Sequence, residues 1–304
     1  MLDARAVALW TPEAGQRSVR IVDAPAGDAD ALLDLPVVTI AVGDDAPACD
    51  LFAADDDAAR EWESLLRRAP RAACVAALLV RRESSSLVAE SLAYSLLQSG
   101  PEFGAWLERR GPAPGVPDPH DTRLRVDVDH RGARITLTRA RRANALDVRM
   151  RDALCDALDA LAHDDSPITV DAEGNAFCTG GDLDEFGTAP APVDAHLVRL
   201  ARSPALRFEH LGSRMTVHLH GNALGSGIEL AAFASRVVAT PDTRIGLPEL
   251  DLGLVPGAGG TVSIVRRVGR RRFLELLVRG QTIDAPTALD WGLVDEIARH
   301  SLGV

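Results

Sequence analysis

The sequence predicts an α/β fold with crossover connections, and three observations support that prediction. The chain has 304 residues, of which 46% are hydrophobic and 25% charged, as is typical of a soluble globular protein with a buried core. Strand-like and helix-like segments alternate through 121–304, as they do when crossovers connect the strands of a sheet. A stretch dense in Pro and Gly at 109–123 lacks hydrophobic periodicity and predicts a linker. We therefore place an N-terminal α/β extension at 1–120 and a second domain at 121–304.

Hydrophobic spacing gives the order of elements in the second domain. Paired strands are expected at 124–130 and 133–139, because apolar residues alternate on both sides of a turn. A helix follows, since Leu and Met recur at helical spacing over 146–161 and Asp147 can cap its start. Asp284 can cap the last helix of the domain in the same way. The other expected elements are strands at 167–174, 214–221 and 236–240, a helix at 228–234, and a long loop rich in Gly and Pro at 246–260.

The N-terminal extension gives weaker signals. A strand is expected at 35–43 and helices at 58–69 and 86–100. The segment 35–56 also resembles 166–187 in its strand, its turn and its cysteine-bearing loop. This likeness suggests that the extension is a degenerate copy of the opening of the second domain, without the Gly-Gly pair of that loop.

Charge and composition exclude several classes of partner and chemistry. The net charge of −11 argues against nucleic acid or an anionic membrane as the partner. No apolar run reaches the ~20 residues that span a bilayer. The N-terminus lacks the apolar core of a signal peptide, so a cytoplasmic protein is expected. The chain contains no lysine, which excludes a Walker A loop and Schiff-base chemistry.

Cysteine and histidine spacing predicts neither disulfides nor a metal site. The four cysteines show no CxxC spacing, so we expect free buried thiols. His218 and His220 share one face of a predicted strand, but no third ligand lies nearby in the sequence. We therefore expect these histidines to be structural or solvent-facing, and no metal is expected.

Two stretches of small residues carry the strongest chemical signal. "CTGGDL" at 178–183 and "ALGSGIE" at 223–229 each follow a predicted strand and leave backbone N–H groups accessible to a ligand. Two such groups aimed at one oxygen form an oxyanion hole, although tight turns without a ligand would show the same spacing. Glu229 lies just inside an apolar helix, where an unpaired carboxylate is costly, and this favours a functional site.

Five motifs follow one another in a characteristic order across 121–297. They are "NAL" at 144–146, "AFCTGGDLDEF" at 176–186, "HGNALGSGIELA" at 220–231, and the segments 245–269 and 276–297. In order and spacing they resemble the enoyl-CoA hydratase/isomerase (crotonase) superfamily. The resemblance implies a crotonase-like spiral of ββα turns that binds an acyl-CoA thioester. It also implies that the N–H groups of Gly181 and Ser226 hold the thioester carbonyl, although the family usually has Gly where Ser226 stands.

Two glutamates resemble the pair found in the hydratases of this superfamily. Glu229 lies in the helix after the glycine run, and Glu249 lies in the following loop. The resemblance implies a lyase that adds water across the 2,3 double bond of a trans-2-enoyl-CoA. Glu249 would donate a proton to the α-carbon, and Glu229 would orient and activate water. The alternatives are another crotonase reaction on an acyl-CoA (isomerisation, thioester hydrolysis or cofactor-free oxygenation) and a non-catalytic partner subunit of the same fold.

The resemblance also implies how CoA binds. The adenine would lie near the backbone of Ala143 and Ala145, and Arg141 and Arg142 are candidates for phosphate contacts, unless they form only a solvated basic run. No cofactor is expected apart from coenzyme A as part of the substrate. A homo-oligomer, either a trimer or a hexamer, is expected from the family.

The chain departs from the family in other places besides Ser226, and one of them is the pair His218 and His220, where relatives are usually apolar or small. Typical members continue beyond the "GLV" motif with a helical tail that closes over the acyl pocket and helps to form the trimer, whereas this chain stops at Val304. We expect the helical segment 86–110 to cover the pocket instead. Asp184 stands where many relatives carry a basic residue, which disfavours phosphate binding at that point.

Overall fold

A six-stranded sheet forms the centre of the computed structural model. The structure describes residues 4–8, 20–24, 37–43, 49–81, 86–113 and 122–298. The strands of the central sheet are β5 (Leu124–Asp129), β6 (Gly132–Leu137), β7 (Ile168–Ala172), β8 (Met215–Leu219), β10 (Arg236–Ala239) and β13 (Glu296–Ile297). Their order is β13-β10-β8-β7-β6-β5, with an antiparallel β5–β6 hairpin and parallel pairing elsewhere. The predicted α/β architecture with crossover connections is therefore confirmed.

A small second sheet positions the glycine-rich segments. Its strands are β9 (Asn222–Leu224), β11 (Arg244–Gly246) and β12 (Ile283–Asp284). β9 and β11 run parallel, while β12 pairs antiparallel with β11. Because β9 ends two residues before α9 (Ser226–Ala231), this sheet fixes where that helix begins.

The helices of the second domain pack around these two sheets. They are α6 (Val148–Leu161), α7 (Pro192–Ala201), α8 (Pro204–Leu211), α9, α10 (Gly260–Arg279) and α11 (Ala285–Trp291). The predicted N-caps are confirmed: Asp147 accepts a hydrogen bond from the Met150 amide, and Asp284 accepts one from the Thr287 amide. A non-helical Gly269 kinks α10 at its middle.

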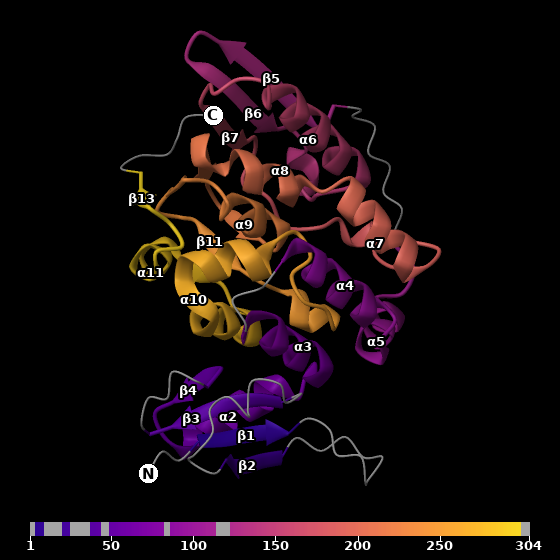
Figure 1. Ribbon diagram of the computed structural model, residues 1–304, viewed down its shortest axis with the longest axis vertical. Helices are drawn as coiled ribbons and strands as arrows, with labels where there is room; N and C mark the ends of the chain where they lie inside the picture. The colour runs from indigo at the N-terminus through magenta and orange to yellow at the C-terminus, as the bar shows by residue number, and fades with distance from the viewer. Residues whose placement is uncertain are drawn as a thin grey trace.

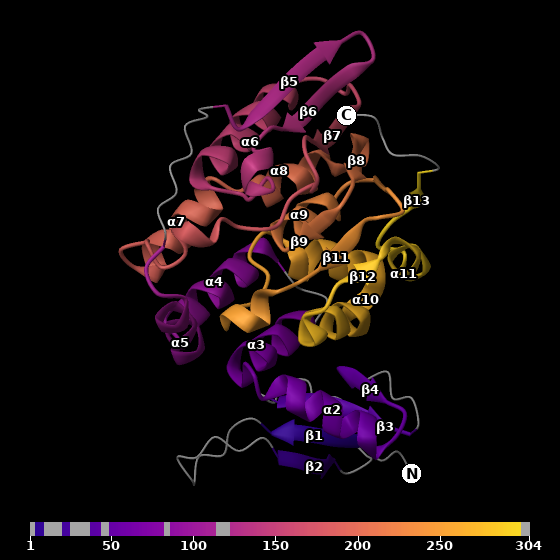
Figure 2. The same cartoon turned by 180° about the vertical axis from the view of Figure 1, so that it is seen from behind.

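Among its described residues, the N-terminal extension adds a third sheet and four further helices. The strands are β1 (Ala4–Ala8), β2 (Arg20–Ala24), β3 (Val37–Val42) and β4 (Leu51–Ala53), and the helices are α2 (Asp56–Leu66), α3 (Pro70–Arg81), α4 (Leu87–Gln98) and α5 (Pro101–Arg110). Figures 1 and 2 show this sheet at one end of the molecule, with α3 next to α10 and α4 next to α7. Buried apolar side chains from both parts of the chain form one continuous core.

The sheet of the extension can be compared with the second domain. In its sheet the order is β2-β1-β3-β4, with β3 antiparallel to β1 and parallel to β4. The strand that resembles β3 in the second domain is β7, which pairs in parallel with both β6 and β8. The two segments therefore share one strand pairing and differ in the other, and the degenerate copy stays a prediction. The predicted linker lies largely at 114–121, outside the described residues.

Other expectations about the chain can be compared directly with the structure. The predicted strand at 35–43 corresponds to β3, and the predicted helices at 58–69 and 86–100 correspond to α2 and α4. The predicted loop at 246–260 contains a 3₁₀ turn, η4 (Glu249–Leu252), and leads into the long helix α10. All four cysteines are free and buried, as expected. Within the described residues, no helix has both the length and the apolar character needed to cross a bilayer.

The helices of the extension pack closely on loops of the second domain. A Cβ atom added to Gly187 would lie 2.9 Å from Leu107 on α5, and one added to Gly257 would lie 2.5 Å from the Tyr94 ring on α4. On α5, Trp106 contacts Phe186 edge-to-face with ring centroids 6.0 Å apart. The segment that was expected to cover the pocket thus touches the loops that follow both the glycine-rich segment and η4.

Gly257→Ala tests this close packing. We expect the new methyl group to displace the Tyr94 ring and to lower the free energy of unfolding by about 1–3 kcal/mol, as overpacking does. The matched control is Gly104→Ala in α5, because a Cβ atom there would meet no atom within 4 Å. The control should stabilise the protein by about 0.5–1 kcal/mol, since Ala is the better helix former. Urea unfolding measures both variants, and equal stability of the two would contradict this packing.

Candidate active site

The two glycine-bearing segments meet side by side. An isolated bridge pairs Cys178 with Ala223: the Leu224 amide donates to the Cys178 carbonyl at 2.9 Å. Gly181 and Ser226, the two predicted oxyanion-hole residues, both follow this bridge by three residues, Gly181 in a loop that bridges to Leu146 and Ser226 at the start of α9. Their N–H groups donate to no other described residue. Two backbone donors are therefore available at one place, which is the requirement for an oxyanion hole.

The start of α9 explains why glycines flank Ser226. Gly225 has a φ of 48°, in the left-handed region, and a Cβ atom there would lie 2.7 Å from Glu249 Oε1. A Cβ atom on Gly227 would lie 2.6 Å from the Cys178 carbonyl oxygen. Ser226 itself has no positive φ. A serine is therefore tolerated between the two glycines, because only its amide is needed.

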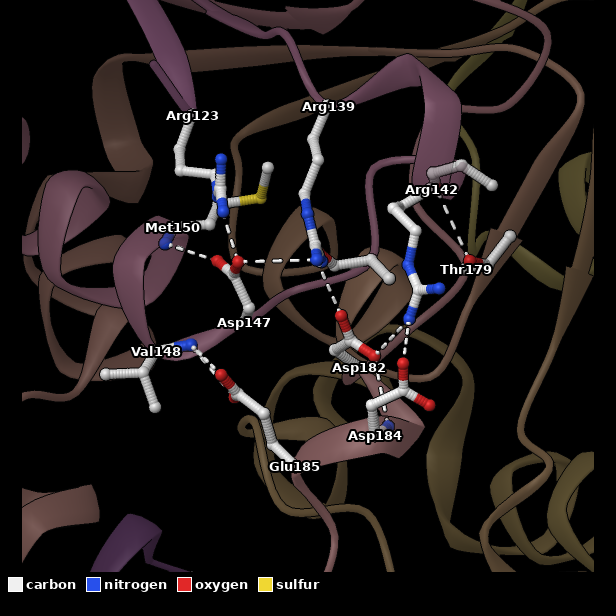
Figure 3. Close-up of polar contacts among 12 residues, drawn as sticks. Arg123, Arg139, Arg142, Asp147, Val148, Met150, Thr179, Asp182, Asp184 and Glu185 are labelled. Carbon is white, nitrogen blue, oxygen red and sulfur yellow. Dashed lines mark hydrogen bonds and ion pairs between the residues drawn. The ribbon is translucent and has the colours of Figure 1, made fainter. Parts of the chain in front are cut away.

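A ladder of alternating arginines and aspartates supports the segment that follows Gly181 (Figure 3). Arg139 donates to Asp182 at 2.7 Å and lies 3.4 Å from Asp147. Arg142 contacts Asp182 at 3.0 Å and Asp184 at 2.6 Å. Burial disfavours the ionised form of Asp182, but the Asp184 amide and the two arginines hold its pKa below the ordinary range. The ladder fixes the backbone next to Gly181, because Asp147 and Asp182 are buried and each is paired with arginine.

This ladder determines which of the predicted CoA-binding arginines has donors left for a ligand. Arg142 is occupied by Asp182 and Asp184, whereas Arg141 is exposed and contacts no other described residue. The Ala143 carbonyl accepts hydrogen bonds from Thr179, and the Ala145 carbonyl accepts one from Arg139. The roles of these four residues in CoA binding stay predictions. Of the two arginines, Arg141 is the one whose donors are free for a phosphate.

Glu229 is buried and held by backbone amides. Only 2% of its surface is exposed, and its Oε2 atom accepts hydrogen bonds from Ala258 N at 2.7 Å and Gly260 N at 3.0 Å. Burial raises the pKa of this carboxyl well above its usual range, and the charges of Glu249 and Glu90 raise it further. Its second oxygen makes no hydrogen bond with a described residue, so it is free to bind water or substrate.

Glu249 is a second buried glutamate, and its Oε1 lies next to Gly225. It is the first residue of η4, and its Oε2 is buried without a hydrogen-bond partner among the described residues. Burial raises the pKa of this carboxyl to about 8, with a further contribution from the charge of Glu90. A carboxyl group of this kind holds a proton at neutral pH and can donate it.

The structure adds a third buried carboxyl that the sequence interpretation missed. Glu90 comes from α4 in the extension, is 2% exposed, and accepts hydrogen bonds from Gly259 and Thr261. Burial raises its pKa to about 7. The available signal was a glutamate inside an apolar helix, "SLVAESLAYSLL", which is the signal that singled out Glu229.

The two histidines lie away from these carboxyls. His218 has a buried Nδ1 without a partner among the described residues, and burial lowers its pKa. His220 Nε2 contacts the Gly174 carbonyl at 3.0 Å. In the part of the chain that the structure describes, no three His, Cys, Asp or Glu side chains are arranged as metal ligands.

Together these groups can polarise a carbonyl and move protons beside it. Two free amides can hold a carbonyl oxygen, and an enolate oxygen that forms there would be stabilised by the same donors. Glu229 and Glu249 lie within electrostatic range of each other, so the two carboxyls do not both ionise easily. One protonated and one ionised carboxyl form an acid–base pair.

The raised carboxyl pKa values make stability depend on pH. The pKa of Glu249 changes from an ordinary 4.5 to about 8, so between these values the folded state keeps a proton that the unfolded chain releases. The free energy of unfolding should therefore fall as pH rises through this window, by up to about 1.4 kcal/mol per pH unit for one group. We expect Glu249→Gln to flatten this slope in urea unfolding at pH 5, 6, 7 and 8.

The control for this measurement is Glu61→Gln, because Glu61 is 61% exposed on α2. It should keep the slope of the parent protein. A Glu249→Gln variant with the slope of the parent would show that this carboxyl is already ionised near pH 5.

Comparison with known proteins places the similarity in the second domain. A family model described as enoyl-CoA hydratase/isomerase matches residues 131–301. A protein of Bacillus subtilis (strain 168) named "Probable enoyl-CoA hydratase" is 37% identical over 155 residues, which are 50% of this chain and 60% of that protein. The 2,3-dehydroadipyl-CoA hydratase of Escherichia coli (strain K12) is 34% identical over 178 residues, or 57% of this chain and 68% of that protein. The chain thus spans less than two thirds of the Bacillus relative.

Solved structures share the fold of the same region. An enoyl-CoA hydratase of Mycobacterium smegmatis has a TM-score of 0.54 and 33% identity, covering 58% of this chain and 70% of its own. A protein of Thermobifida fusca YX, solved in complex with CoA, has a TM-score of 0.53 and 29% identity, covering 59% of this chain and 72% of its own. These structures confirm the crotonase-like fold expected from the sequence.

Proposed function

Because the chain belongs to the enoyl-CoA hydratase/isomerase family, we propose that it adds water across the 2,3 double bond of a trans-2-enoyl-CoA thioester. One observation carries this proposal: two buried glutamates, Glu229 and Glu249, lie beside two unoccupied backbone donors. The names of both similar hydratases include a CoA compound, and one similar protein was solved with CoA bound. The comparisons show membership of the family, and the activity, its reaction and its residues are our proposal.

The proposed mechanism begins with the thioester carbonyl. Its oxygen accepts hydrogen bonds from the N–H groups of Gly181 and Ser226, and these donors stabilise the enolate that forms in the reaction. The Asp–Arg ladder beside Gly181 keeps one donor in place without direct contact with substrate. Such preorganised donors are effective because they need no rearrangement during the reaction.

The two carboxyls carry out the addition of water. Glu229 acts in its ionised form, which the Ala258 and Gly260 amides stabilise. It binds water through its free oxygen and takes a proton from it, while the water oxygen forms a bond to the β-carbon. Glu249, which is protonated at neutral pH, gives a proton to the α-carbon. The double bond becomes a single bond, one C–O bond and one C–H bond form, and no oxidant or reductant is needed.

The assignment of hydration over the other reactions of the family rests on this glutamate pair. Isomerisation, thioester hydrolysis and cofactor-free oxygenation would use the same carbonyl site with a different use of the carboxyls. The two carboxyls share one site but differ in their partners, since Glu229 is held by two amides and Glu249 has an unpartnered oxygen. This asymmetry suits one base and one acid.

CoA binding and assembly complete the proposal. We assign Arg141 to a CoA phosphate, because its guanidinium is exposed, and we assign the adenine to the backbone near Ala143 and Ala145. The expected homo-oligomer and a cytoplasmic location stay predictions.

Ser226→Pro tests the oxyanion hole. Proline at the first residue of α9 removes the amide donor but suits the start of a helix, so the fold should survive. We expect kcat/KM on a trans-2-enoyl-CoA to fall by about 10²–10³-fold, as it does when one oxyanion donor is lost. Ser226→Ala, which keeps the amide, should retain turnover within a few-fold of the parent. If both variants were equally active, this amide would not hold the carbonyl.

Glu229→Gln and Glu249→Gln test the acid–base pair. Turnover of short, medium and aromatic trans-2-enoyl-CoA thioesters is followed by the loss of enoyl absorbance. We expect each variant to lose about 10²–10⁴-fold in kcat, because each removes one proton-transfer group. Parent protein that binds CoA but turns over no thioester would indicate another reaction of the family. Parent protein that does not bind CoA would indicate a partner-binding subunit.

A further inference from the structure

Glu90 is a buried carboxyl outside the region that the family model matches. Its Oε1 accepts a hydrogen bond from Gly259 N at 2.7 Å. Its Oε2 accepts two from Thr261, one from the amide at 2.9 Å and one from the hydroxyl at 2.7 Å. Three donors at the start of α10 thus bind one carboxylate on α4. Glu90 lies at least 169 residues before these donors in the chain.

Glu90 and Glu229 share the same turn of backbone. Glu229 binds the amides of Ala258 and Gly260, and Glu90 binds those of Gly259 and Thr261. The four successive amides therefore alternate between the two carboxylates. Any displacement of this turn would move both carboxylates at once, so the position of Glu229 depends on α4 as well as on α9.

We propose that Glu90 is a positioning residue of the active site: it anchors the 258–261 turn that holds Glu229, and its negative charge keeps the proton on Glu249. Glu90 does not touch the reacting atoms in this role. The proposal rests on the proposed hydration, because the proton on Glu249 is the one donated to the α-carbon.

Several charged and polar groups around Glu90 offset the cost of burying its ionised form. They are the Thr261 hydroxyl, two amides and the Arg199 guanidinium of α7. The negative charge of Glu90 in turn raises the pKa of Glu229 on α9 and of Glu249 in η4. Tyr94, one turn along α4, completes this set of groups together with His196.

Arg199 and His196 connect α7 to the face of α4 that carries Glu90. His196 Nδ1 lies 2.9 Å from the Ser91 hydroxyl, and Arg199 donates to the Ser91 and Ser95 hydroxyls at 3.0 and 3.1 Å. The Arg199 guanidinium also stacks on Tyr94 at 4.4 Å from the ring centroid. These contacts fix α4 against α7. The position of the Glu90 carboxylate is therefore set both by α7, through α4, and by the amides at the start of α10.

The test is the pH profile of kcat in Glu90→Gln. Removal of the negative charge makes ionisation of Glu249 easier, so the alkaline limb of the profile should move to lower pH by about one unit. Glu90→Asp keeps the negative charge on a side chain that is shorter by one methylene group. The alkaline limb of this variant should stay near that of the parent, while kcat falls. Thr261→Val removes only the hydroxyl donor, and it should give a smaller shift in the direction of Glu90→Gln.

Glu102→Gln is the matched control for loss of a helix-capping carboxylate. The half-buried Glu102 on α5 accepts hydrogen bonds from the Arg71 and Ala72 amides at the start of α3, whereas the 258–261 amides bind Glu90 and Glu229. This variant should lose stability without any shift of the limb. A shift equal to that of Glu90→Gln would mean that general destabilisation moves the profile, and the proposal would be overturned.

A second readout does not depend on turnover. Isotope-edited infrared spectroscopy of the protein labelled at glutamate carboxyls follows their titration in the parent and in Glu90→Gln. We expect the highest carboxyl titration midpoint to fall in Glu90→Gln and in Thr261→Val. An unchanged midpoint in both variants would overturn the positioning role, even in an active enzyme. A shifted midpoint in a protein that hydrates no thioester would leave the charge coupling standing and would overturn only the proposed hydration.

Discussion

The backbone amides of residues 258–261 are the constraint on which the site depends. A buried carboxylate is strongly unfavourable unless donors replace its water, and here four amides serve two carboxylates. The amides can bind Glu229 only if the separation of α9 and α10 stays as it is. They can bind Glu90 only if α4 packs against α10. The arrangement of three helices is therefore tied to the same few hydrogen bonds.

A second set of contacts holds the loop that follows Gly181. The Asp–Arg ladder holds the backbone at 182–184, and α5 contacts the next few residues through Trp106 and Phe186. Breaking a buried ion pair on one side only is costly, so the ladder behaves as a unit. The extension thus supports both sides of the site, with α4 beside the carboxyls and α5 beside the oxyanion loop.

Local signals in the sequence predicted what depends on neighbouring residues. The Asp147 and Asp284 caps and the strands at 35–43 and 236–240 were predicted because their causes lie within a few positions. The assignment of Gly181 and Ser226 to one oxyanion hole came from the family resemblance, since the spacing of small residues alone also fits simple turns. Glu90 could not be placed, because no local rule brings residue 90 to residue 259. The long helix α10 was missed because glycines and an arginine run hide its apolar period.

The sequence separation between Glu90 and its donors has a consequence for how the protein is made. On the ribosome, α4 emerges long before Thr261 exists, because 171 residues separate the two. At synthesis rates of about 5–20 residues per second, the Glu90 carboxylate waits roughly ten to thirty seconds for its partners. Before it is buried, its ordinary pKa of 4.5 keeps it ionised in water. The acid–base site is therefore completed only after the start of α10 has been synthesised and has packed against α4.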